Sequence, residues 1–118
     1  MFAPVFIDHK GHRILRLDYS GLSPDQLVGA MREAMRVVAL QPPGSVRLLT
    51  IANALLDERS AEAIRRYARH NKPYVRASAL VGPSPFQKVL LLSIKVQGRP
   101  ELEAFDDEEK AKDWLVSH

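Results

Sequence analysis

Apolar residues recur along this chain in two kinds of pattern that alternate, one typical of β-strands and the other of amphipathic helices. Short runs rich in β-branched and aromatic residues predict strands at 4–9, 13–18, 46–51, 74–81 and 101–105. Apolar residues at three- and four-residue spacing predict helices at 24 to about 40, 58–70, 86–97 and from 107 onward. The order β-β-α-β-α-β-α-β-α over residues 1–118 predicts a single α/β domain.

Turn and capping residues separate these elements. Lys10–His12 contains a glycine and predicts a three-residue hairpin connection between the first two strands. Ser23–Pro24 and Ser84–Pro85 combine a capping serine with a proline suited to the first helical position. Asp106 with Glu109 predicts a capping box before the last helix. Helical crossovers join parallel strands, so we expect a five-stranded mixed, mostly parallel sheet with an antiparallel edge and four helices.

The third predicted helix is apolar over a very wide arc. Its apolar residues are Phe86, Val89, Leu90, Leu92, Ile94 and Val96. Leu91 is predicted to lie outside this arc, beside Lys88 and Lys95, whereas Ser93 and Gln97 lie within it. One interpretation is a buried helix in which Ser93 bonds to a backbone carbonyl and Gln97 ends the helix. The other is a self-association surface or a shallow apolar pocket with a polar rim.

Polar residues follow the third and fourth strands, where parallel α/β sheets bind ligands. Asn53, Asp57 and Ser84 are the side chains that could converge there. The prolines on either side of Ser84 have no N–H, so this loop offers few donors for a phosphate. Helix capping is therefore the favoured role of Ser84.

Three stretches resemble a known family. Gln41–Ser45, His70–Val75 and Ala104–Leu115 are similar to segments of small bacterial proteins described as STAS/SEC14-domain-containing, or SpoIIAA-like. The resemblance covers nearly the whole chain and implies the SpoIIAA-like fold. SEC14-type domains bind lipid-like molecules in an apolar cavity but are larger, and this chain has little length to spare for one.

The resemblance also implies an interaction module. STAS domains of anti-sigma-factor antagonists are switched by phosphorylation of a hydroxyl at the start of the helix after the third strand. Asp57 matches the acidic residue that precedes this hydroxyl, but Glu58 occupies the hydroxyl's own position. Ser60 comes two residues later, inside the helix, where it would be a poorer acceptor. We therefore expect a module without this phosphorylation switch.

Composition excludes several classes of site. The 118 residues include no cysteine, which rules out disulfides, thiolate metal ligands and a cysteine nucleophile. The N-terminus lacks a signal-peptide pattern, and the longest apolar run, Val89–Leu92, is too short to span a membrane. Together these features favour a cytoplasmic protein.

Charge is divided unevenly along the chain. Residues 1–100 carry 15 Lys/Arg against 7 Asp/Glu, and residues 101–118 carry 2 against 7. The two regions either neutralise each other in the fold or help to steer a partner. The net charge of +3 is too small to favour nucleic acid, which needs a concentrated basic face.

No pattern of catalytic or metal-binding residues emerges. His9 and His12 flank the hairpin turn with only Asp8 nearby, so we interpret them as solvated turn residues. We expect a non-enzymatic interaction or regulatory module with no cofactor, an unidentified protein partner and a homodimer contact through the third helix. The alternative is a small apolar or lipid-like ligand bound near the third helix and the C-terminal ends of strands three and four. The candidate surface comprises Asn53, Asp57, Glu58, Ser84, Leu91, Ser93 and Gln97.

Overall fold

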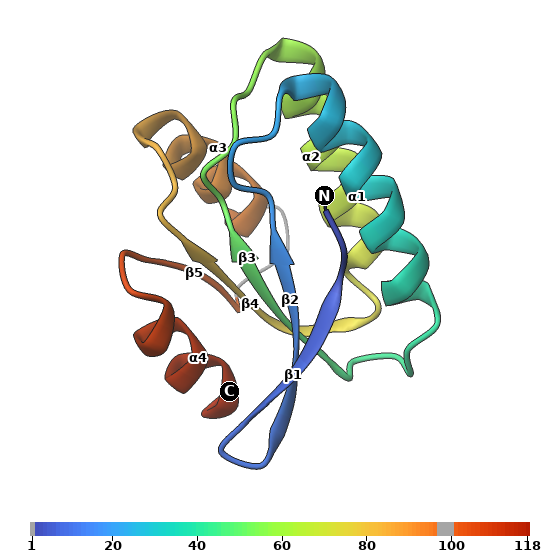
Figure 1. The fold of residues 1–118 in the computed structure, drawn as a ribbon, viewed down its shortest axis with the longest axis vertical. Helices are drawn as coiled ribbons and strands as arrows, with labels where there is room; N and C mark the ends of the chain where they lie inside the picture. The colour runs from blue at the N-terminus through green and yellow to red at the C-terminus, as the bar shows by residue number, and fades with distance from the viewer. Residues whose placement is uncertain (1, 97–100) are drawn as a thin grey trace.

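The computed structural model describes residues 2–96 and 101–118, and it contains the predicted alternation of strands and helices (Figure 1). In chain order the elements are β1 (Val5–His9), β2 (His12–Asp18), α1 (Pro24–Ala39), β3 (Val46–Ile51), α2 (Glu58–Asn71), β4 (Val75–Val81), α3 (Pro85–Val96), β5 (Leu102–Phe105) and α4 (Glu108–Val116). Across the described ranges, no helix has the length and apolar character needed to cross a membrane.

The five strands form one mixed sheet in the order β1-β2-β3-β4-β5. β1 is antiparallel to β2, and the remaining neighbours are parallel, as the hairpin and three helical crossovers predict. The register aligns Leu15, Leu48, Ser78 and Leu102 in one row across four strands. These four side chains therefore share one face of the sheet.

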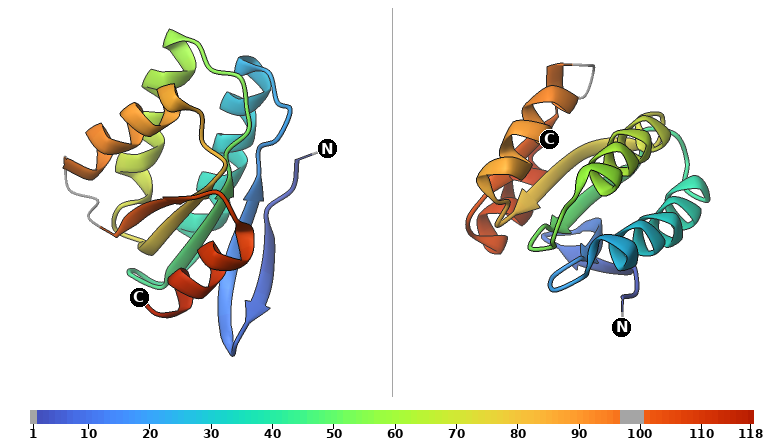
Figure 2. Two further views of the ribbon diagram at one scale, coloured as in Figure 1. Left: turned by 90° about the vertical axis from the view of Figure 1, so that its left-hand side faces the viewer. Right: turned by 90° about the horizontal axis from the view of Figure 1, so that it is seen from above.

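Helices cover the two faces unequally (Figures 1 and 2). α1, α2 and α3 pack on the face that carries the row, in two apolar clusters that include Leu15, Leu48 and Leu102. α4 packs alone on the opposite face, where Ala111 and Leu115 contact Ile14, Leu49, Ala77 and Ala79. All six of these side chains are fully buried, so α4 makes a dense core on its side of the sheet.

Two local predictions were wrong by one residue. The β1–β2 turn has two residues, because Lys10 and Gly11 both adopt left-handed backbone angles and His12 pairs directly with His9. The N-cap of α4 is Asp107 rather than Asp106, and its carboxylate accepts a hydrogen bond from the Glu109 N–H at 3.0 Å. By contrast, Ser23 caps α1 as predicted, with Pro24 at the first helical position.

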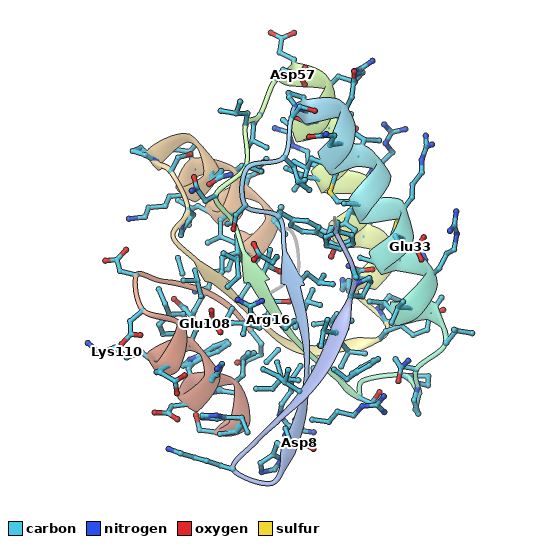
Figure 3. All side chains as sticks on the ribbon, in the orientation of Figure 1. Asp8, Arg16, Glu33, Asp57, Glu108 and Lys110 are labelled. Atoms are coloured by element: carbon cyan, nitrogen blue, oxygen red, sulfur yellow. The ribbon has the colours of Figure 1, made fainter. Side chains whose placement is uncertain are left out.

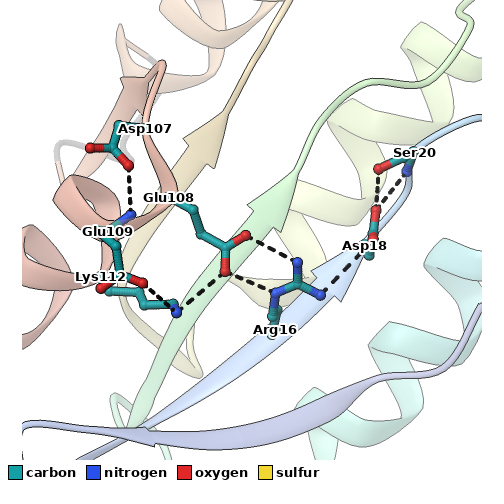
Figure 4. A network of polar contacts seen from close by, with 7 residues as sticks. All are labelled: Arg16, Asp18, Ser20, Asp107, Glu108, Glu109 and Lys112. Carbon is teal, nitrogen blue, oxygen red and sulfur yellow. Dashed lines mark hydrogen bonds and ion pairs between the residues drawn. The ribbon is translucent and has the colours of Figure 1, made fainter.

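Ion pairs join the acidic C-terminal region to the basic body of the protein. Arg16 on β2 binds Glu108 of α4 through two hydrogen bonds of 3.0 and 3.2 Å, and Lys112 approaches the same carboxylate at 3.4 Å (Figures 3 and 4). The bond from Arg16 is the main cause that lowers the pKa of Glu108. In the hairpin, His9 and Lys10 both contact Asp113. Contacts of this kind support the interpretation in which the two regions neutralise each other.

The Arg16–Glu108 pair predicts a pH-dependent contribution to stability. The lowered pKa of Glu108 means that its carboxylate stabilises the folded state above the ordinary glutamate pKa. This contribution is lost as the pH falls through the lowered pKa. Because both side chains are about one-third exposed, we expect Glu108→Gln to cost about 1 kcal/mol of unfolding free energy near pH 7 and a smaller amount near pH 3.

Urea denaturation at both pH values measures this difference. Glu109→Gln is the matched control, since Glu109 is exposed and pairs only with Lys112 in the described ranges. An equal loss for Glu108→Gln at the two pH values would contradict the assigned ion pair.

Candidate functional site

An apolar cavity lies between the sheet and the three helices that cover its first face. Its volume is about 110 Å³, or about 770 Å³ when the open space at its mouth is included. The sheet contributes the floor, with Leu48, Thr50, Ser78, Leu80 and Leu102. The helices and the loop after β3 contribute the walls, including Leu27, Met31, Leu56, Ile64, Tyr67, Ala68, Asn71, Leu90, Leu91 and Ile94. In the part of the chain that the structure describes, no charged side chain lines this cavity.

Small side chains explain why the space is open. Ser78 stands in the row between Leu48 and Leu102, where a larger residue would reach toward the helices. Above it, α2 contributes Ala68, which is 9% exposed. An unfilled apolar volume of 110 Å³ costs about 2–3 kcal/mol of folding free energy. The protein therefore tolerates a substantial packing defect at this place.

Two tyrosines meet in the cavity wall. The Tyr19 hydroxyl donates a hydrogen bond to the Tyr67 hydroxyl at 3.1 Å. Burial raises the pKa of Tyr19 well above its usual value, and the neighbouring Tyr67 raises it further. The Tyr19 hydroxyl is consequently neutral at physiological pH.

Gln87 closes the cavity at the loop that follows β3. Its amide nitrogen donates to the backbone oxygen of Ala52 at 2.7 Å and to that of Ala54 at 3.3 Å. Its amide oxygen accepts from the Ser84 N–H at 2.7 Å, and the Ser84 hydroxyl accepts from the Gln87 N–H. Ser84 is thus the predicted helix cap, and Gln87 completes a capping box while fixing α3 to the loop.

Asn71 leaves a buried donor without a partner. It is the last residue of α2, is 1% exposed and lines the cavity. Its side-chain oxygen lies 2.9 Å from His70 Nδ1, an arrangement in which the imidazole N–H donates and orients the amide. The amide nitrogen, Nδ2, is buried and makes no hydrogen bond within the described ranges. Such a group costs free energy unless something binds to it.

The predicted polar residues do not converge on this cavity. Asn53 is exposed, and its backbone oxygen accepts from the Gly21 N–H. Asp57 is the N-cap of α2 at one end of the molecule (Figure 3), and Glu58 is exposed beside it. The cavity lining includes none of the four residues Asn53, Asp57, Glu58 and Ser84.

Ser60 is enclosed by its own helix cap. Its side chain is fully buried, its N–H donates to the Asp57 carboxylate, and its hydroxyl accepts from the Asp57 N–H at 2.8 Å. A kinase would need to open the first turn of α2 to reach this hydroxyl.

The orientation predicted for α3 was wrong for Leu91. Leu91 packs inward with Leu90 and Ile94 and lines the cavity, whereas Val89 and Leu92 are 68% and 62% exposed. Ser93 is half-buried, and Gln97 lies outside the described residues.

Sequence reasoning missed Asn71 and Gln87. Asn71 reads as a helix stop, yet its spacing of four and three residues from Tyr67 and Ala68 places it on the inward stripe of α2. Gln87 comes three residues after Ser84, which is the spacing of a capping box. Both signals were present in the sequence.

Comparison with known proteins supports the fold. A solved structure from Shewanella loihica PV-4, an uncharacterized protein of the DUF3478 family with a SpoIIAA-like fold, matches with a TM-score of 0.74 at 16% identity. The match covers 97% of this chain and 93% of the other. No family model matches the chain, and no curated protein matches it. The predicted SpoIIAA-like fold is confirmed.

The unpartnered amide predicts a stabilising substitution. Asn71→Leu keeps the branched arrangement of four side-chain heavy atoms and removes the buried donor, while the exposed His70 regains water in place of its lost hydrogen bond. We expect the unfolding free energy to rise by about 1 kcal/mol. Urea denaturation measures this change in unfolding free energy. The control is Asn53→Leu, at an exposed position, which should change stability by no more than about 0.5 kcal/mol. A loss of stability in Asn71→Leu would contradict the assignment.

Proposed function

We propose that this protein binds a small, mainly apolar molecule in the cavity beneath α2 and α3. The observation that carries the proposal is the cavity itself: 110 Å³ of unfilled space with an almost wholly apolar lining. Dry apolar cavities of about 150 Å³ accept benzene. This cavity therefore suits a ring or a short chain of about six to eight non-hydrogen atoms, with any longer part projecting through the mouth.

Several apolar residues of the cavity lining are partly exposed to solvent. Leu56 of the loop after β3, Ile64 of α2 and Leu91 of α3 all line the cavity and retain contact with solvent. A ligand that enters between them would cover these side chains and remove apolar surface from water. This position agrees with the alternative drawn from the sequence, near the third helix and the ends of strands three and four.

The chemistry of the lining favours binding over catalysis. Tyr19 and Tyr67 bond to each other, and Gln87 bonds to the backbone. Across the described residues the lining offers no carboxylate, lysine or imidazole for proton transfer. We therefore propose a non-enzymatic module on a SpoIIAA-like fold.

Exposed apolar residues on α3 favour a second candidate, self-association. Val89 and Leu92 lie one turn apart and are more than half exposed. Pairing of α3 with a second copy would bury them. This candidate corresponds to the homodimer contact expected from the sequence.

Filling the cavity tests the first candidate. Ala68→Leu adds three carbons to the wall, so we expect it to weaken binding of ethylbenzene by about tenfold or more while raising or preserving stability. Isothermal titration calorimetry measures the affinity, and Ala39→Leu, at an exposed position of α1, is the matched control with unchanged binding. Ser78→Val, which adds volume at the floor of the cavity, is the second cavity-filling variant if Ala68→Leu folds poorly. Unchanged affinity in a folded cavity-filling variant would contradict the proposal.

A charge on α3 tests the second candidate. We expect the unaltered protein to sediment as a dimer at high concentration, and Leu92→Lys to sediment as a monomer because a lysine cannot be buried unpaired in that contact. Leu40→Lys, which alters an 82% exposed leucine outside α3, should remain dimeric. A monomeric mass for the unaltered protein would rule out self-association.

A further inference from the structure

Resting on the proposed function, we infer that the hydroxyl of Thr50 is the polar contact of the cavity floor, and that it selects an apolar ligand carrying one uncharged oxygen. This oxygen is a carbonyl or a hydroxyl, as in a small ketone or alcohol. Plain hydrocarbons and free carboxylates are the classes that the site disfavours.

The sheet places Thr50 at the cavity. Thr50 lies on β3, the central strand, and pairs with Leu17 on one side and Leu80 on the other. It comes two residues after Leu48, so its side chain leaves the same face of the sheet, toward the cavity that both residues line. Leu48 is 3% exposed, whereas Thr50 is only partly buried, although helices cover this face. The space that exposes Thr50 is therefore the cavity.

The Thr50 hydroxyl is accessible and has hydrogen bonds to offer. In the ranges that the structure describes, it makes no hydrogen bond to the protein. The buried side-chain polar atom without a partner in those ranges is Asn71 Nδ2, so the Thr50 oxygen is not buried. A ligand in the cavity does not reach that enclosed amide nitrogen, but it can reach the hydroxyl, which donates one hydrogen bond and accepts others.

Other polar side chains of the lining are engaged or enclosed. Tyr19 bonds to Tyr67, and Gln87 bonds to the backbone of the loop after β3. Ser78 is 3% exposed. Thr50 is therefore the lining residue best placed to form a hydrogen bond with a ligand.

Burial of a ligand makes this hydroxyl selective. A ligand that fills the cavity displaces water from the Thr50 hydroxyl, and a hydrocarbon then leaves the hydroxyl unpaired in apolar surroundings. A carbonyl or hydroxyl oxygen on the ligand restores a hydrogen bond. A carboxylate would lose its hydration without gaining an opposite charge, because no cationic side chain is found among the described lining residues.

Removal of the hydroxyl tests the inference by calorimetry, with ethylbenzene and acetophenone as two probes of similar shape. Thr50→Val keeps the branched side chain and loses the oxygen, so we expect it to lower the preference for acetophenone over ethylbenzene by about fivefold. Thr50→Ser is the matched control, because it keeps the hydroxyl and should leave this preference within about twofold. Thr50→Ala, which also lacks the hydroxyl, repeats the test if Thr50→Val folds poorly. Benzoate should bind the unaltered protein at least about tenfold more weakly than acetophenone.

A second measurement reports the contact directly. Thr50 is the only threonine in the chain, so its methyl group gives one unambiguous NMR signal in a threonine-labelled sample. We expect this signal to shift saturably as acetophenone is added.

The outcomes separate this inference from the proposed function. A preference unchanged in Thr50→Val, or lowered equally in Thr50→Ser, would overturn the role of the hydroxyl and leave cavity binding intact. Binding of acetophenone without a shift of the Thr50 methyl signal would overturn the contact with Thr50. Benzoate bound as tightly as acetophenone would overturn the selection for uncharged ligands. Failure of both ethylbenzene and acetophenone to bind would overturn cavity binding and the inference together.

Discussion

The small side chains of β4 are the constraint on which the rest of the structure depends. On one face, Ala77 and Ala79 let α4 approach closely, so that Ala111 and Leu115 become fully buried. On the other face, Ser78 lies between Leu48 and Leu102. The side chains of the covering helices do not fill the space beside it, and the cavity remains there. One strand thus gives a dense core on the side of α4 and a cavity on the side of α1, α2 and α3.

The cavity survives because the elements around it are fixed independently. Gln87 fastens the start of α3 to the loop after β3, and capping boxes hold the first turns of α1 and α2. Across the sheet, Arg16 and Glu108 hold α4 in place. The unfilled cavity costs about 2–3 kcal/mol of folding free energy. Binding of the proposed ligand would offset part of that cost.

Much of the fold could be predicted from the sequence because the apolar periodicity and the helix caps agree with each other. The hairpin turn and the cap of α4 were wrong by one residue, since Lys10 adopts an unusual left-handed conformation and Asp106 and Asp107 are both suitable caps. Leu91 was placed wrongly because α3 is apolar on nearly every side, so periodicity alone does not fix its inward face. An apolar pocket near the third helix was one alternative drawn from the sequence, but its lining could not be predicted, because it depends on which small residues face one another across the sheet and α2.

The most direct test of cavity binding is a titration of methyl-labelled protein with acetophenone, followed by NMR. If the cavity binds acetophenone, we expect saturable shifts at the cavity methyls of Leu48, Ile64 and Ile94, with Val89 and Leu92 on the outer surface of α3 unaffected. Shifts confined to Val89 and Leu92, or no saturable shift at any of these methyls, would contradict it.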